Sequence, residues 1–146
     1  MGNTHQTIEI DAPLENVWAK ISDFHNMDWA SGVIASCLSI DKIGSREVGA
    51  KRLLNGAIHE TLLELDSEQH IMRYSIDDGP SPIASNEVSN YIGVITLTPS
   101  TGSGQTSVEW TSSWQGNEVA ATKFCSGVYN ALLAALKTSF AVAAAG

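Results

Sequence analysis

Apolar and polar residues alternate along most of the chain, and the period changes near its end. Segments in which β-branched, aromatic and aliphatic residues recur between turn residues predict strands. They cover residues 4–10, 33–40, 48–54, 58–65, 70–76, 90–98 and 106–114. From Asn117 onward the apolar residues recur every three or four positions, which predicts one long amphipathic helix. The pattern therefore predicts about seven strands followed by a helix.

The segment between the first two strands is predicted to be helical. Val17, Trp18 and Ile21 share one helical face, Asp11 is a candidate N-cap, and Pro13 lies near the first turn. A second, short helical turn is predicted over residues 24–29. Because the remaining strands follow one another without crossover helices, they are expected to be antiparallel. We therefore expect an α+β fold in which an antiparallel sheet curls around the last helix.

Three further segments predict turns and loops. Asn55-Gly56 between two strand patterns is a hairpin signal. Residues 77–82 contain a glycine and two prolines, which exclude regular structure and predict a long loop. Residues 99–104 form a polar, glycine-containing connection between the last two strands.

Length and charge restrict the classes of protein. The 146 residues, 43% of them hydrophobic and 16% charged, are expected to form one globular domain over residues 1–146. A formal net charge of −8 disfavours binding to nucleic acids and to anionic membrane surfaces. Polar residues such as Lys123, Asn130 and Lys137 interrupt the last helix, so we expect no membrane insertion.

Known catalytic and cofactor motifs are missing from the sequence. Cys37 and Cys125 have no metal-ligand spacing, and we interpret them as reduced thiols of a cytoplasmic protein. His59-Glu60 resembles the start of a zinc-protease motif, but Leu63 stands where the second histidine is needed. No nucleophile elbow or phosphate-binding loop is present. The sequence therefore predicts neither a metal nor a cofactor.

Glu60 is the charged residue that the pattern places against apolar walls. It lies between Ile58 and Leu62 on one face of a predicted strand, so its carboxylate points inward if that face is the core face. A buried carboxylate needs a partner. Arg52 faces Glu60 if the intervening loop has an odd number of residues, whereas a two-residue turn places Lys51 there. The alternative is an exposed strand pair at the sheet edge.

Aromatic residues and the helix stripe supply candidate cavity walls. Trp110 lies on the inner face of the last predicted strand, and Tyr91 opens the strand before it. Aromatic side chains with polar tips suit a cavity wall, although core packing against the helix explains them equally well. The apolar stripe of the helix includes Phe124, Val128 and Leu132, which are expected to face the sheet.

Several short motifs resemble one family over nearly the whole chain. They are Ile10-Asp11-Ala12-Pro13 with Val17-Trp18, Asp23-Phe24 with Trp29, Gly49-Ala50-Lys51-Arg52, and Glu60-Thr61-Leu62. In order and spacing they resemble the bacterial polyketide cyclase/dehydrase-like family of the START and birch-pollen-allergen (Bet v1-like) superfamily. The resemblance implies a helix-grip fold, in which a seven-stranded antiparallel sheet wraps around a long C-terminal helix and leaves a hydrophobic cavity.

A local resemblance to plant abscisic acid receptors adds detail. It covers Gly49-x-x-Arg52, Asn55-Gly56, Glu60-x-Leu62 and Asn90-Tyr91. It implies that Glu60 and Tyr91 are polar ligand contacts and that residues 53–57 and 78–90 are gates over the cavity. The cavity lysine of those receptors falls at Ala35, so an acidic ligand would lack its anchor.

Two functions follow as expectations. The first is a carrier that binds a small hydrophobic or amphipathic molecule between sheet and helix. Its expected ligand-binding residues are Glu60, Tyr91, Trp110, Phe124, Val128 and Leu132, with Arg52 in a structural ion pair. The alternative is a cyclase or dehydratase in which Glu60 acts as acid/base and Tyr91 polarises a carbonyl. The sequence leaves the oligomeric state open.

Overall fold

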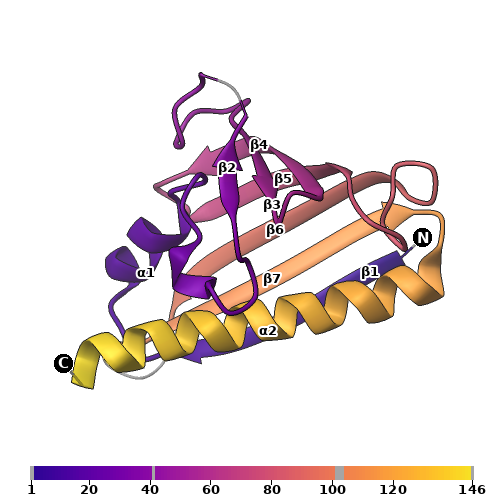
Figure 1. The fold of residues 1–146 in the computed structure, drawn as a ribbon. Coiled ribbons are helices and arrows are strands. Elements are labelled where there is room, and N and C mark those ends of the chain that lie inside the picture. The colour runs from indigo at the N-terminus through magenta and orange to yellow at the C-terminus, as the bar shows by residue number, and fades with distance from the viewer. Residues whose placement is uncertain (1, 41, 101–103, 146) are drawn as a thin grey trace.

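The fold is one antiparallel sheet wrapped around a long helix (Figure 1). The computed structural model describes residues 2–40, 42–100 and 104–145. The strands are β1 (Gly2–Ile10), β2 (Cys37–Ser39), β3 (Lys51–Leu54), β4 (Ile58–Asp66), β5 (Ile71–Asp78), β6 (Ser89–Pro99) and β7 (Thr106–Gln115). The helices are α1 (Leu14–Ile21), the 3₁₀ turn η1 (Asp28–Ala30) and α2 (Glu118–Ala145). The predicted α+β class and seven-stranded antiparallel sheet are confirmed.

Sheet order places the first strand beside the last strand. The strands follow the order β1-β7-β6-β5-β4-β3-β2, and every neighbouring pair is antiparallel. Each strand after β1 therefore pairs with its neighbour in sequence, and β1 closes on β7 at the far edge. After β7 the chain turns back, and α2 runs alongside β1 toward η1 (Figure 1). The helix is thus the second layer of the core.

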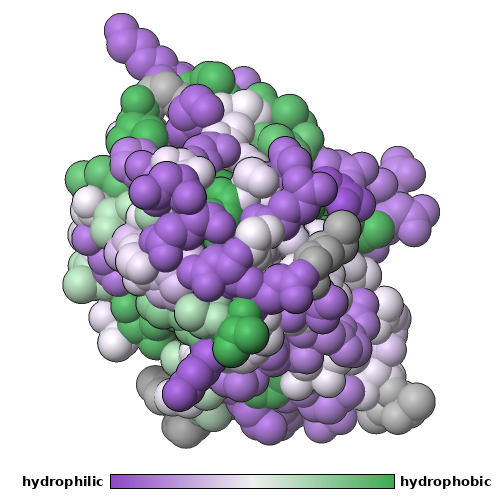
Figure 2. All heavy atoms as spheres, turned by 90° about the vertical axis from the view of Figure 1, so that its right-hand side faces the viewer, coloured by the Kyte–Doolittle hydropathy of each residue, from purple (hydrophilic) through white to green (hydrophobic). Residues whose placement is uncertain are grey.

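The buried stripe of α2 explains why this helix packs on the sheet. Ala121, Cys125, Tyr129, Leu132 and Leu136 recur every three or four residues, and all are at most 4% exposed. By length and composition residues 118–141 could cross a membrane, but here the apolar stripe packs into the protein core. The end of the molecule where β1 and α2 begin presents mainly hydrophilic residues with apolar ones interspersed (Figure 2). The apolar character of α2 is accordingly that of a core helix.

The start of α1 corrects one sequence prediction. Pro13 occupies the N-cap position in extended conformation, and its carbonyl accepts hydrogen bonds from the N–H groups of Asn16 and Val17. Asp11 lies outside the helix and does not cap it, because α1 begins only at Leu14. The second helical turn is shorter than predicted, since only η1 is helical within residues 24–30.

Two strands are shorter than the apolar pattern predicts. In the segment 33–40 only β2 is a strand. The backbone groups just before it form hydrogen bonds with the Asn55 side chain instead of with a neighbouring strand. Its Oδ1 accepts hydrogen bonds from the N–H groups of Ala35 (2.6 Å) and Ser36 (3.3 Å), and its Nδ2 donates to Val33 O (3.2 Å). In the segment 48–54 the strand begins at Lys51, because Gly49 has a φ of +96° and breaks the extended conformation.

Core packing of α2 gives a stability test. Leu136 is fully buried on the helix stripe, so Leu136→Ala should lower the free energy of unfolding by about 2–5 kcal/mol. Val119 on the same helix is 86% exposed, so Val119→Ala should change the free energy of unfolding by less than about 0.5 kcal/mol. Urea unfolding followed by circular dichroism measures both. Equal midpoints for the two variants would contradict the packing of α2.

Candidate functional site

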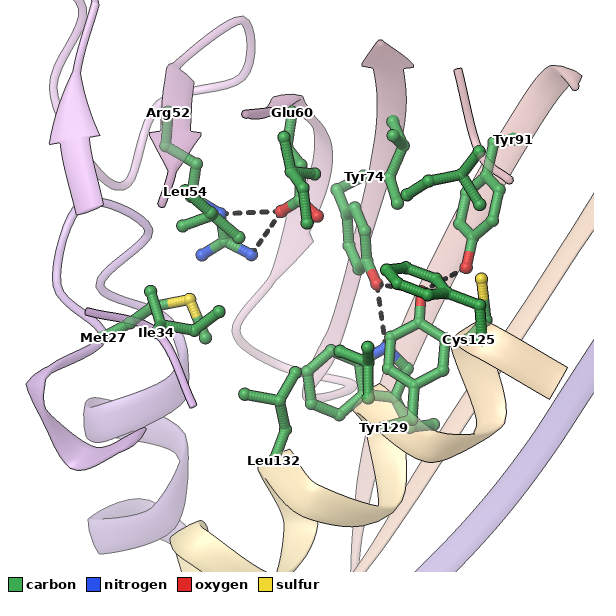
Figure 3. Close-up of a pocket in the computed structure, with 16 residues that line it drawn as sticks. Met27, Ile34, Arg52, Leu54, Glu60, Tyr74, Tyr91, Cys125, Tyr129 and Leu132 are labelled. Carbon is green, nitrogen blue, oxygen red and sulfur yellow. Dashed lines mark hydrogen bonds and ion pairs between the residues drawn. The ribbon is translucent and has the colours of Figure 1, made fainter. Parts of the chain in front are cut away.

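A small cavity lies between the inner face of the sheet and α2 (Figure 3). The space open to the centre of a water molecule is about 30 Å³, enough for about two waters. All six predicted ligand-binding residues line it: Glu60, Tyr91, Trp110, Phe124, Val128 and Leu132. Their role in binding stays a prediction, but the fold brings them to one place.

The mouth of the cavity is marked by its half-buried lining residues. Ile58 on β4, Ile76 on β5, and Phe124 and Val128 on α2 are only partly covered, whereas most other lining residues are buried. The opening therefore lies between the β4–β5 pair and one side of α2.

The deepest charged group is an ion pair between β3 and β4. Arg52 pairs with Glu60 in the strand register, and the two residues are 3% and 5% exposed. Both Arg52 Nε (2.8 Å) and Arg52 Nη2 (2.7 Å) contact the same oxygen, Glu60 Oε1 (Figure 3). The Arg52–Glu60 alternative is therefore the one that the structure contains.

The length of the β3–β4 connection decides this pairing. Asn55 and Gly56 have positive φ angles and form the tight turn, and Ala57 adds a third residue before β4. With three intervening residues Leu54 faces Ile58 and the pairing falls on Arg52. Lys51 instead faces Thr61 on the exposed side, where its Nζ donates to Thr61 Oγ1 (2.9 Å). Two alternative predictions are therefore wrong: that Lys51 is the partner of Glu60, and that Glu60 belongs to an exposed strand pair at the sheet edge.

The remaining contacts of Arg52 are also buried. Its Nη1 donates to Phe24 O (3.0 Å), and its guanidinium lies 3.9 Å from the centroid of the Phe24 ring. Burial raises the pKa of Glu60, and the positive charge and hydrogen bonds of Arg52 act in the opposite direction. No described residue donates a hydrogen bond to the second carboxylate oxygen, Glu60 Oε2.

A cluster of three tyrosine hydroxyls forms the other polar part of the cavity. Tyr129 Oη lies 2.8 Å from Tyr74 Oη and 2.5 Å from Tyr91 Oη. Trp110 Nε1 donates to Tyr74 Oη (3.0 Å), which joins the indole to the cluster. Burial raises the pKa of all three tyrosines, so the hydroxyls stay protonated at neutral pH. We call Tyr74, Tyr91 and Tyr129 the tyrosine triad.

The sequence prediction missed two members of this triad. Tyr129 lies four residues after Cys125 and three before Leu132, so the helical stripe itself could have placed it at the cavity. Tyr74 alternates with Met72 and Ile76 along β5, which is the signal of an inward-facing strand position. Ordinary core residues show the same two patterns. Only the short distances between the hydroxyls in the structure show that Tyr74 and Tyr129 belong to a polar cluster.

Local packing holds the triad in place. Gly93 on β6 faces Tyr74 in the register, and a Cβ at this glycine would overlap the Tyr74 ring. Tyr91 stacks on Trp114 with ring centroids 5.3 Å apart and an angle of 6° between the planes. The rings are therefore fixed from the sheet side, and their hydroxyls meet Tyr129 on α2.

The two predicted gate segments each contribute one residue to the lining. Leu54, the last residue of β3, comes from the segment 53–57, and Ile83 comes from the loop 79–88. This loop is held by Asp78 Oδ1, which accepts hydrogen bonds from the N–H groups of Gly79 and Ser85, both at 2.9 Å. Movement of either segment stays a prediction.

The described residues offer no ready alternative chemistry. Within residues 2–40, 42–100 and 104–145, no group of three or more His, Cys, Asp and Glu side chains could hold a metal ion. Burial raises the pKa of both Cys37 and Cys125, which lowers the thiolate fraction on which nucleophilic attack depends. The polar groups that line the cavity include Glu60, Arg52 and the tyrosine triad.

Comparison with known proteins identifies the family. The family model described as "Polyketide cyclase / dehydrase and lipid transport" matches residues 1–141. The chain belongs to this family. The resemblance seen in the sequence is confirmed at the level of this family, whose description names cyclase, dehydrase and lipid-transport functions and no ligand. The similarity to abscisic acid receptors and the cytoplasmic location stay predictions.

Solved structures of similar proteins cover the same length. A protein from Nitrosospira multiformis is 40% identical, with 94% of this chain and 95% of that chain covered and a TM-score of 0.91. The protein XoxI from Bacillus cereus is 26% identical, with 96% of each chain covered and a TM-score of 0.76. A protein from Bacillus thuringiensis is 25% identical, with coverage of 95% and 98% and a TM-score of 0.75.

The buried ion pair gives a second stability test. Arg52→Met leaves the Glu60 carboxylate buried without a partner and should lower the free energy of unfolding by about 3–5 kcal/mol. The double variant Arg52→Met/Glu60→Leu removes both charges and should recover most of that loss. Lys51→Met, on the exposed side of the same strand, is the matched control. Urea unfolding of the four proteins measures the effect, and a double variant as unstable as Arg52→Met would contradict it.

Proposed function

We propose that the protein binds a small hydrophobic or amphipathic molecule in the cavity between the sheet and α2. The observation that carries this proposal is the composition of the cavity wall. Aliphatic and aromatic side chains surround two buried polar groups, the Arg52–Glu60 pair and the tyrosine triad. An apolar wall with a few fixed polar groups is the usual form of a small-molecule site. The family description, which includes lipid transport, supports the same function.

Binding in this cavity requires it to open. A space for about two waters is far too small for a molecule with an apolar body. The half-buried residues at the mouth, together with Leu54 at the end of β3 and Ile83 in the loop 79–88, are the residues whose side chains can move without breaking the sheet. We therefore expect the ligand to enter between β4–β5 and α2 and to displace these side chains.

Blocking the mouth tests the proposal. Val128→Trp should fill the half-buried mouth on α2, and Val119→Trp puts the same side chain on an exposed site of the same helix. With 2-naphthol as probe, isothermal titration calorimetry should show binding to the wild type and to Val119→Trp. Val128→Trp should weaken it at least tenfold. Unchanged affinity in a folded Val128→Trp variant would rule out the cavity as the binding site.

A second function is favoured by one specific observation. Glu60 and Tyr91 line the same cavity, as acid/base catalysis in a cyclase or dehydratase requires. Glu60 Oε2 is the atom that could take a proton from the carbon next to a carbonyl group. Tyr74 lies on β5, between the strands of Glu60 and Tyr91, so its hydroxyl is the nearer candidate for polarising that carbonyl.

A simple elimination tests this second function. The probe 4-hydroxy-4-phenylbutan-2-one loses a C–H proton and its hydroxyl group, as water, to form a conjugated ketone that is followed by ultraviolet absorption. If the protein is an enzyme of this type, it should accelerate the reaction, and Glu60→Gln should lower turnover about 10²-fold or more. Glu64→Gln, on the exposed face of the same strand, is the control. No acceleration by the wild type, or equal rates for the two variants, would contradict a role of Glu60 in this chemistry.

A further inference from the structure

We propose that the polar group of the ligand is an uncharged hydroxyl that binds between Glu60 and the tyrosine triad. This inference rests on the proposed binding function and specifies the chemical class of the ligand: an apolar molecule with an alcohol or phenol group. Two features of the cavity support it: an available acceptor at Glu60 and an available donor in the tyrosine triad.

The acceptor side is the second oxygen of Glu60. Both contacts of Arg52 end on Oε1, and the third donor group of Arg52, Nη1, is engaged with Phe24 O. Figure 3 shows the other carboxylate oxygen on the side of Tyr74, away from the guanidinium. Glu60 Oε2 is not among the described buried atoms that lack a partner, so it is open to the cavity. A ligand in the cavity can therefore reach Oε2 and donate a hydrogen bond to it.

The donor side follows from the number of hydroxyl protons. The triad has three hydroxyl protons and two contacts between hydroxyls, so one proton is left over. Ser112 and Cys125 are hydrogen-bond partners of Tyr91, and the Thr4 hydroxyl lies 2.5 Å from that of Ser112. Adding these three residues gives six protons and five contacts. One proton is again left over. Trp110 cannot use it, because its indole N–H only donates.

The charge of Glu60 determines where the spare proton lies. The spare proton can lie at one of three ends of this hydrogen-bonded cluster, Tyr74, Thr4 or Cys125. Tyr74 is the triad member on the strand next to Glu60, and Glu60 acts electrostatically on it. A negative carboxylate attracts a hydroxyl proton, so the hydrogen bonds should run toward Tyr74 and leave its O–H as a donor at the cavity.

Among hydroxyl, ketone, ether, carboxylate and ammonium groups, the hydroxyl matches both sides. A hydroxyl donates to Glu60 Oε2 and accepts from Tyr74 O–H, whereas a ketone or an ether can only accept. A carboxylate would meet the negative Glu60, and Arg52, the cation among the lining residues, is already paired. An ammonium group has no acceptor for Tyr74 and would lie near Arg52. The geometry therefore favours a neutral hydroxyl over charged and acceptor-only groups.

Three probes of similar shape test the inference. They are 2-naphthol, which donates and accepts, 2-methoxynaphthalene, which only accepts, and 2-methylnaphthalene, which does neither. Calorimetric titration of the wild type should give at least tenfold tighter binding of 2-naphthol than of 2-methylnaphthalene, with the ether between them. Equal affinity for all three, abolished in each case by Val128→Trp, would overturn the hydroxyl inference and leave the binding function intact. If none of the probes binds, the proposed function fails as well.

Two variants separate the donor from the acceptor. Tyr74→Phe should remove the advantage of the ether over 2-methylnaphthalene. Glu60→Gln keeps an oxygen for Arg52 and turns an NH₂ group toward the cavity, so it should reverse the order and favour the ether over 2-naphthol. Glu64→Gln on the exposed face should leave all ratios unchanged. A loss of stability alone cannot reverse the order of two probes, and if either variant fails to fold, the wild-type ratios still decide.

Discussion

The buried contact between Arg52 and Glu60 is the interaction on which the arrangement of the site depends. It requires the three-residue connection between β3 and β4, because a connection one residue shorter would turn Lys51 toward Glu60. It also fixes the segment after α1, since the guanidinium bonds to Phe24 O and covers the Phe24 ring. Two charges in an apolar interior are stable only when each has its partner, so strand register and loop length are coupled to this one pair.

The tyrosine triad connects the two layers in a different way. Tyr74 and Tyr91 come from adjacent strands, and Tyr129 comes from α2, so the hydroxyl contacts join the sheet to the helix across the cavity. Gly93 makes this possible by leaving room for the Tyr74 ring on the sheet surface. Because hydroxyls can exchange partners with little change in position, this connection tolerates a ligand better than the ion pair does.

Sequence patterns were sufficient for most of the fold and for half of the site. The alternation of strands and the helical stripe of α2 are local properties, and the predicted sheet and helix both occur. The overlong prediction for residues 33–40 failed because Asn55, more than fifteen positions later in the chain, takes the backbone groups that a strand would need. Asp11 was a plausible cap by residue type alone, but the position of Pro13 decides where α1 begins.

Site residues were predictable where their type is unusual for their position. Glu60 stands out as a charge on an apolar face, and its placement was predicted. Tyr74 and Tyr129 fit their apolar patterns so well that nothing in the sequence marks them as polar groups. Whether Arg52 or Lys51 faces Glu60 depended on a single residue of loop length, and the sequence signal Asn55-Gly56 fits both lengths.

The small volume of the cavity follows from the same polar groups. Glu60, Arg52 and the triad satisfy most of their hydrogen-bonding capacity among themselves, so apolar side chains can close over them without leaving many unpaired atoms. A ligand must therefore displace side chains from a closed site, and apolar burial has to exceed that cost before any polar contact contributes. Once inside, its polar group has to match the donors and acceptors of the cavity wall, because a mismatch leaves them unpaired. In this closed cavity the affinity of a ligand should therefore depend mainly on the size of its apolar part, which has to offset the displacement of apolar side chains. Its selectivity should depend on its hydrogen-bonding pattern, because a mismatch affects Glu60 and the tyrosine triad.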